Sequence, residues 1–270
     1  MLLGIQKKRF VKVKNENKMK LQYASDLHLE FPENSNFLMQ NKIVPKGDIL
    51  LLAGDIVLFE RMDKHDDFFQ YLSDNFQATY WVPGNHEYYY FDAANKSGTI
   101  NEKIKSNVFL VNNTSIIHDN VKLIFSTLWT KIGSGYEMQI ESGLNDFHVI
   151  KYNSKRFSAR QYNNFHLQSI DFIKKELEIN NDNKTIVVSH HVPTFYNYPE
   201  QYKGSVLNEA FAVELFNFIE IAGPDYWIYG HNHFNQPDFK IGHTKIKTNQ
   251  LGYVRYNEHL SYKNDISFKV

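Results

Sequence analysis

The stretch Ile49-Leu50-Leu51-Leu52-Ala53-Gly54-Asp55 decides the fold of this chain. Its five apolar residues predict a strand buried on both faces, because such strands read as continuous apolar runs rather than alternating ones. Gly54 then lets the backbone turn sharply, and Asp55 is left as a carboxylate at the end of the strand. The stretch therefore predicts a layered α/β domain whose strands carry polar chemistry at their ends.

Four further polar clusters follow predicted strands in the same way. The strands are expected at residues 21–25, 79–82, 184–189 and 226–229. The clusters that follow them are Asp26-x-His28, Gly84-Asn85-His86-Glu87, His190-His191 and Gly230-His231-x-His233. Because strand carboxyl ends gather along one edge of an α/β sheet, we expect the five clusters to converge.

The residue types in these clusters indicate metal binding. Taken singly, a Gly-Asp pair or a strand-end histidine is more typical of a turn or an exposed side chain. Together, neutral nitrogen and anionic oxygen donors suit Mn, Fe, Zn or Ni better than Ca or Mg. A carboxylate can bridge two ions about 3.5–4 Å apart, and Asp55 is the expected bridge.

The ordered combination of D-x-H, GD, GNHE, a strand-end histidine and GHxH resembles the calcineurin-like metallophosphoesterases, in particular their small bacterial-type phosphohydrolases. The motifs span Asp26 to His233, most of the chain. The resemblance implies an α/β fold, a four-layer αββα sandwich of two mixed β-sheets flanked by helices. It also implies a metal-dependent phosphohydrolase that cleaves phosphate mono- or diesters by attack of a metal-bridging hydroxide.

The resemblance also implies a role for each motif residue. His86 would be the catalytic, non-ligand histidine beside the leaving group. The cofactors would be two divalent or transition-metal ions, with Mn expected first and Fe, Zn or Ni as alternatives. One ion would be held by Asp26, His28, Asp55 and His233, and the other by Asp55, Asn85, His190 and His231.

The sequence departs from the family three residues after the bridging aspartate. Many members carry an acid at that position, and the protein Ser/Thr phosphatases have an arginine next to it. Here the two positions hold Leu58 and Phe59. The acid that would orient His86 is therefore not supplied there, and a protein Ser/Thr phosphatase is not expected.

Composition narrows the alternatives. Lys plus Arg and Asp plus Glu are both 30, so whole-chain charge does not favour nucleic acid as a partner. The chain has no cysteine, which excludes thiolate metal sites and disulfides. No apolar run reaches the roughly 20 residues that span a bilayer, and the N-terminus lacks the features of a signal peptide. We therefore expect a cytoplasmic protein acting on a small phosphate ester. A nuclease and a non-catalytic binding scaffold remain the alternatives.

Domain organisation follows from the same pattern. Residues 1–18 are expected to be an N-terminal basic extension, with an added strand or a contact arm as the alternative. Residues 19–270 are expected to form a single domain, in which the unpatterned segment 133–152 is a long loop that could set substrate specificity.

A hairpin is expected around residues 115–126, a loop at the first prolines and a short strand near 253–256. Helices are expected at 63–75, 93–105, 158–179 and 207–221.

Several residues outside the metal motifs could have either a functional or a structural role. Tyr88, Tyr89 and Tyr90 could form an aromatic wall near the leaving group, or could simply pack. Asn145 and Asp146 could contact the site from the long loop, or be solvated. The basic group Lys155, Arg156 and Arg160 could bind a substrate phosphate, or could belong to a solvated helix start.

Overall fold

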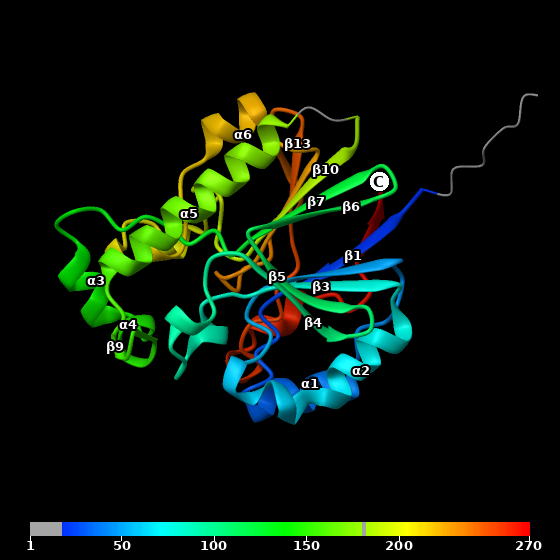
Figure 1. Cartoon of the computed structure of the whole chain (residues 1–270), viewed down its shortest axis with the longest axis horizontal. Helices are drawn as coiled ribbons and strands as arrows, with labels where there is room; N and C mark the ends of the chain where they lie inside the picture. Colours follow the sequence, from blue (N-terminus) through cyan, green and yellow to red (C-terminus); the bar gives the residue numbers. More distant parts are fainter. Residues whose placement is uncertain (1–17, 180–181) are drawn as a thin grey trace, which may run out of the picture.

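Two six-stranded mixed sheets packed face to face form the centre of the molecule, with helices on both outer sides (Figure 1). The structure is a computed structural model that describes residues 18–179 and 182–270. The expectation for residues 1–18 therefore lies outside the described residues, Lys18 excepted. The predicted four-layer αββα architecture is confirmed.

The first sheet contains the apolar stretch that precedes Asp55. Its strand order is β14-β1-β2-β3-β5-β4, with the two edge strands antiparallel to the parallel centre. Every residue of β2 and β3 is buried, which explains their continuous apolar sequences. The strands are β1 Lys20–Ala24, β2 Ile49–Ala53, β3 Ala78–Val82, β4 Ile100–Lys105, β5 Val108–Asn112 and β14 Ser267–Lys269.

The second sheet repeats this plan, with strand order β12-β13-β11-β10-β7-β6. The predicted hairpin is confirmed, because β6 and β7 pair antiparallel with Ile116 opposite Leu123. Between the two sheets lies a core that includes Tyr23, Leu51 and Val188. The strands are β6 Thr114–His118, β7 Val121–Ser126, β10 Lys184–Ser189, β11 Tyr226–Tyr229, β12 Phe239–Ile241 and β13 Thr244–Thr248.

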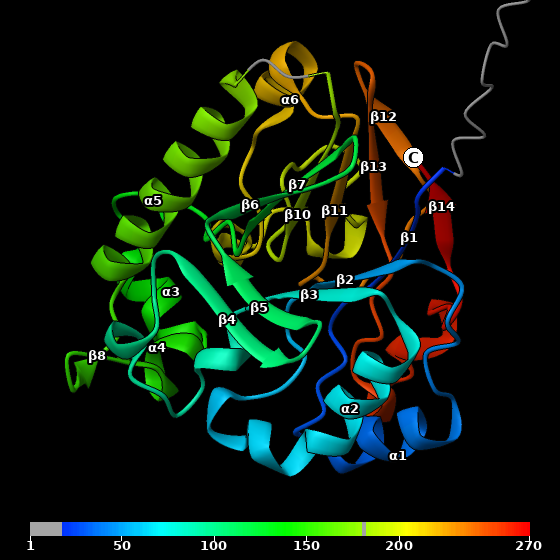
Figure 2. The same ribbon diagram turned by 45° about the vertical axis from the view of Figure 1, so that its right-hand side comes forward.

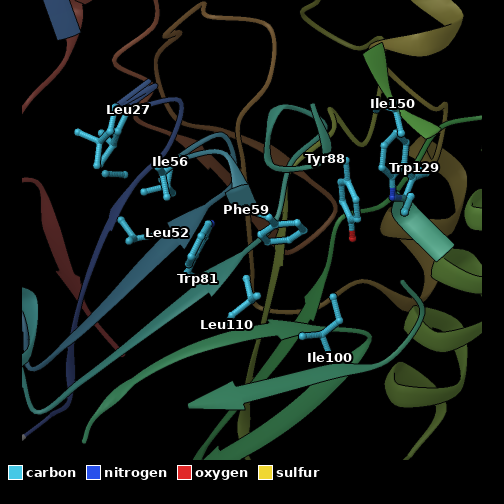
Figure 3. Close-up of a cluster of buried hydrophobic side chains, with 14 of the residues drawn as sticks. Leu27, Leu52, Ile56, Phe59, Trp81, Tyr88, Ile100, Leu110, Trp129 and Ile150 are labelled. Carbon is cyan, nitrogen blue, oxygen red and sulfur yellow. The ribbon is translucent and has the colours of Figure 1, made fainter. Parts of the chain in front are cut away.

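Amphipathic helices cover the outer faces of both sheets (Figure 2). On the first sheet lie α1 (Pro32–Gln40) and α2 (Asp66–Asn75), where Phe69 stacks on Trp81 at 5.4 Å between ring centroids. On the second lie α5 (Ala159–Glu178) and α6 (Phe216–Ala222). Figure 3 shows part of the core on the outer side of the first sheet, with Trp81, Leu52 and Leu110 from the strands. No helix in the part of the chain that the structure describes is long and apolar enough to cross a membrane.

Two predictions on the first sheet were wrong. A helix was expected over residues 93–105, but the chain forms the 3-10 turn η3 (Ala93–Asn95) and then strand β4. Gly98, with φ of +72°, separates the two, and β4 is hydrogen-bonded to β5. The loop expected at the first prolines is instead helix α1, whose first turn contains Pro32. Proline is favoured there because the first turn needs no backbone N–H donor.

Three predictions in the second half of the chain also need correction. The segment 133–152 is not a plain loop, because it contains α3 (Glu137–Gly143) and α4 (Asp146–Val149). The helix expected at 207–221 is split into η5 (Val206–Ala210) and α6, because residue 212 bridges to residue 192. The strand expected near 253–256 is the 3-10 turn η6 (Val254–Tyr256). The remaining short elements are η1 Phe59–His65, η2 His86–Tyr88, η4 Glu200–Tyr202, η7 Glu258–Ser261, β8 Lys151–Tyr152 and β9 Lys155–Arg156.

Candidate metal centre

All seven predicted ligands come together where the polar loops of the two sheets meet. They form two adjacent groups that share Asp55, and within each group the ligand atoms of the His and Asp side chains lie within 4.8 Å of one another. Asn85 joins the second group, with its Oδ1 3.2 Å from His190 Nε2. The first group is Asp26, His28, Asp55 and His233, and the second is Asp55, His190 and His231.

Asp55 stands between the two groups. Its Oδ2 lies 3.7 Å from His28 Nε2, and its Oδ1 lies 3.4 Å from His190 Nε2. Burial opposes the ionised form, but the nearby histidines, His190 foremost, hold the pKa of Asp55 well below its usual range. Each oxygen of an ionised carboxylate therefore faces one of the two groups.

The hydrogen bonds of the imidazole rings decide which nitrogens are free to bind a cation. His190 Nδ1 donates to the Ala53 carbonyl at 2.8 Å, and His233 Nδ1 donates to Glu258 Oε2 at 2.7 Å. In each neutral ring the proton is therefore on Nδ1, and Nε2 carries a lone pair that faces the group. Such backing by a carbonyl or carboxylate is typical of histidines that bind metals.

The free nitrogens face one another in pairs. His28 Nε2 lies 2.9 Å from His233 Nε2, and His190 Nε2 lies 3.0 Å from His231 Nδ1. Two lone pairs at these distances repel unless a cation or a proton lies between them. With the adjacent carboxylates, the donor set thus fits a transition-metal ion in each group.

The backbone of the polar loops is unusual. Asp26, His28, Asp55, His231 and His233 all have φ between +48° and +81°, a region that side chains other than glycine rarely adopt. Such conformations cost of order 1–3 kcal/mol each and cluster at functional sites. The surrounding sheets must hold these residues in place.

At two of the motif glycines the backbone passes close to candidate ligands. A Cβ on Gly84 would lie 2.2 Å from Asp55 Oδ1, and one on Gly54 would lie 2.2 Å from His190 Nδ1. Neither position has room for a side chain without displacing a candidate ligand. This explains why glycine precedes the polar residues in these motifs.

Glu87, the last residue of the GNHE motif, ties the loops after β2 and β3 together. It is fully buried, and its carboxylate accepts hydrogen bonds from the backbone N–H groups of Asp55, Ile56 and Gly84 and from Trp81 Nε1, at 2.7–3.1 Å. Burial and the charge of Asp55 raise its pKa to about 8, while these donors favour the ionised form. The sequence did not reveal this role.

Replacing Glu87 with glutamine should destabilise the fold. The new amide would point N–H groups at existing N–H donors, which we expect to lower the free energy of unfolding by about 3 kcal/mol. Urea denaturation of the metal-free protein measures this. The control is Glu102→Gln, which removes a half-buried surface pair with Lys96 and should cost less than about 1 kcal/mol. Equal losses in the two variants would contradict the structural role.

Asp146 orients the amide of Asn85. Asn85 Nδ2 donates to Asp146 Oδ1 at 2.9 Å, so the amide oxygen is the atom that faces His190. Tyr89 also donates to the same Asp146 oxygen, at 2.9 Å. Asp146 belongs to α4, so the predicted contact of this segment with the site is present.

Losing this orientation should weaken metal binding. We expect Asp146→Leu to lower the affinity of the second group by about 10–100-fold, because Asn85 can then rotate its NH₂ toward the site. Asp146→Asn keeps a carbonyl oxygen for both donors and should retain most of the affinity. Titration of the metal-free protein with Mn²⁺ distinguishes the two variants, and equal affinity in both would contradict this role.

His86 lies beside the two groups and belongs to neither of them. Its Nδ1 donates to Glu30 Oε1 at 2.9 Å, and His28 Nδ1 donates to the same oxygen at 3.0 Å. Burial opposes protonation of His86, but the charges of Asp55 and Glu30 outweigh it and raise its pKa. Tyr89 stacks on the His86 ring at 4.1 Å between centroids.

Glu30 thus supplies the acid that Leu58 does not. Leu58 is buried and apolar, and Glu30 reaches His86 from the loop after β1. The paired histidines overcome the effect of burial and lower the pKa of Glu30 to about 2. Its position two residues after His28, in the cluster that follows β1, is a signal that could have revealed it. Glu258, which backs His233, has no such signal.

A cavity of about 430 Å³ opens onto both groups. The segment 133–152 contributes Leu144, Asn145 and Asp146 to its wall, and the chain after β10 contributes Tyr198 and Phe211. Of the predicted aromatic wall, Tyr89 lines this cavity, whereas Tyr88 is packed in the core (Figure 3).

The predicted basic group lies apart from the cavity, because none of its three residues is among the lining. Arg156 instead donates to the backbone carbonyls of Phe147 and Glu141. It therefore holds the segment 133–152 in place.

The two-sheet fold and the converging nitrogen and oxygen donors define the class of metal-dependent hydrolases. Residues 19–235 match the calcineurin-like phosphoesterases (Metallophos), and the chain belongs to this family. This match confirms the family predicted from the order of the motifs. Membership implies metal-dependent hydrolysis of phosphate esters.

Two similar proteins extend the comparison. The chain is 34% identical over 263 residues to the uncharacterized protein L509 of Acanthamoeba polyphaga mimivirus, a match that covers 86% of this chain and 91% of that protein. The phosphopantetheinyl hydrolase PptH of Mycobacterium tuberculosis has a similar structure, with a TM-score of 0.64 over 94% of this chain and 96% of its own. At 15% sequence identity, this likeness shows the fold alone.

Proposed function

We propose that the chain hydrolyses phosphate diesters at a centre of two transition-metal ions, Mn²⁺ first among them. The observation that carries the proposal is Asp55, whose two carboxylate oxygens each face one group of donors. Asp26, His28 and His233 would hold one ion with Asp55, and Asn85, His190 and His231 would hold the other. When bound, the ions supply a hydroxide nucleophile near neutral pH and neutralise the phosphate oxygens.

His86 would act on the leaving group. In the protonated ring Nδ1–H is bonded to Glu30, and Nε2 lies 3.3 Å from the Tyr253 hydroxyl. Nε2–H would donate its proton to the departing alcohol oxygen in place of this tyrosine contact. Hydrolysis then yields a phosphate monoester and a neutral alcohol. The raised pKa of His86 favours the protonated ring that this step requires.

The charge of the cavity favours diesters over monoesters. Of the described side chains that line it, none is a cation apart from the histidines, and the acids include Asp146 and Glu258. A diester carries one negative charge on its phosphate, whereas a monoester carries up to two that only the ions could offset. The same lack of lysine and arginine gives no support to the nuclease alternative, which needs a basic groove along a nucleic acid.

The test is metal-dependent turnover of bis(p-nitrophenyl) phosphate and p-nitrophenyl phosphate. We expect two transition-metal equivalents per chain, no activity after chelation, recovery on adding Mn²⁺ and a higher kcat/KM for the diester. No metal-dependent turnover of either ester would overturn the proposal and favour the binding scaffold. Salt-sensitive cleavage of DNA would favour the nuclease.

A further inference from the structure

Two exposed arginines lie beside His86 in a second cavity. This cavity, of about 420 Å³, is lined by Arg61 and Arg255. It shares His86, Tyr89, Asn145 and Tyr253 with the metal cavity. Arg61 comes from η1 after β2, and Arg255 from η6 near the end of the chain. The fold therefore brings two cations from distant segments to the same place next to His86.

Neither arginine has a carboxylate partner. Within the ranges 18–179 and 182–270, neither guanidinium takes part in a salt bridge or a side-chain hydrogen bond. Arg255 is instead held by aromatic rings, 4.6 Å from the centroid of Tyr256 and 5.5 Å from that of Phe31. Cation–π contacts of this kind position a guanidinium and leave its N–H donors free.

The acid in this cavity is already paired. Glu30 lies among the lining residues, but its Oε1 accepts hydrogen bonds from both His28 and His86, and its Oε2 is buried. The arginine donors are thus available to a ligand. Among the described residues that line the metal cavity there is no arginine or lysine.

The two cavities differ in charge, and they would therefore accept different substituents of a phosphate diester. An alcohol whose oxygen meets His86 can extend past the ring into the cavity with Arg61 and Arg255. The other arm would then occupy the metal cavity, whose wall includes Tyr198 and Phe211. An anionic group on the leaving alcohol would meet two guanidinium groups, whose N–H donors match carboxylate and phosphate oxygens.

We propose that Arg61 and Arg255 form an anion subsite for the leaving group, so that the preferred substrates are phosphodiesters whose leaving alcohol carries a carboxylate or a second phosphate. The inference rests on the proposed hydrolase function and adds the substrate class. In this proposal the two arginines determine which leaving groups are preferred. His86 and the candidate metal ligands keep the roles given above.

The test uses a pair of diesters that differ only in the charge of the leaving group. These are methyl 4-nitrophenyl phosphate and its analogue with a carboxylate at position 3 of the ring. We expect the wild type to prefer the carboxylated diester, so that the ratio of its kcat/KM to that of methyl 4-nitrophenyl phosphate is above one. In the double variant Arg61→Gln, Arg255→Gln this ratio should fall about tenfold. A third diester with a phosphate on the leaving ring shows which anion is preferred.

Arg160→Gln is the matched control, because Arg160 is an exposed arginine that lines a different cavity. It should leave the ratio unchanged. In the wild type, added KCl should lower kcat/KM for the carboxylated diester more than for methyl 4-nitrophenyl phosphate, which lacks the second negative charge.

A wild-type ratio near one would overturn the inference without any variant, as would a ratio that changes equally in Arg160→Gln and the double variant. Turnover of both diesters with a ratio that the arginine variants do not alter would overturn the subsite alone. If the wild type hydrolyses neither diester, the proposed function itself fails.

Discussion

Asp55→Asn is expected to lower kcat/KM for bis(p-nitrophenyl) phosphate by at least about a thousandfold, roughly 4 kcal/mol of transition-state stabilisation. Asparagine offers one oxygen and no charge, so it can no longer serve both groups of donors. The amide nitrogen would also face His28 or His190, each of which lies within 3.7 Å of an Asp55 oxygen. Steady-state kinetics with added Mn²⁺, together with metal analysis of the purified variant, measures both losses.

Asp119→Asn is the matched control. Asp119 is an exposed residue of the hairpin turn between β6 and β7, and its φ of +50° is tolerated by asparagine. This variant should keep wild-type activity and metal content. Bound metal at two equivalents in Asp55→Asn, with activity within tenfold of wild type, would remove Asp55 from its proposed bridging role.

His86→Gln is expected to lower kcat by about 10²–10⁴ for a diester with a poorly acidic leaving alcohol. The loss should be smaller for a p-nitrophenyl ester, because p-nitrophenolate leaves without being protonated. Metal content should stay near wild type, since His86 belongs to neither group that shares Asp55. Comparing kcat for a series of aryl diesters with leaving groups of increasing pKa reveals the difference.

The control for this variant is His243→Gln, an exposed histidine between β12 and β13. It should have no effect on any ester. If His86→Gln lowers kcat equally for good and poor leaving groups, His86 is not the proton donor. Its side-chain bond to Glu30 and the bond from its backbone N–H to Asp55 Oδ1 would then be structural.

Local patterns in the sequence predicted individual strands and the polar residues that follow them, and the family resemblance implied their arrangement in two sheets. A buried strand needs a continuous apolar run, and a glycine followed by a polar residue marks where the strand ends, so Asp55 and Asn85 could be found without the structure. Failures occurred where contacts from elsewhere in the chain decide the conformation. Residues 100–105 form a strand because β5 pairs with them, and residues 211–215 leave the helix because residue 212 bridges to residue 192.

By itself, the sequence determined the family, the order of the motifs and the seven candidate ligands. Each motif is short and follows its own strand, so it can be recognised locally. Only the tertiary structure decided what surrounds His86: Glu30 in place of the acid absent at Leu58, and Arg61 and Arg255 in the cavity beside it. Glu30 lies 56 residues from His86, and a contact across that distance is set by the packing of the sheets and leaves no periodic trace in the chain.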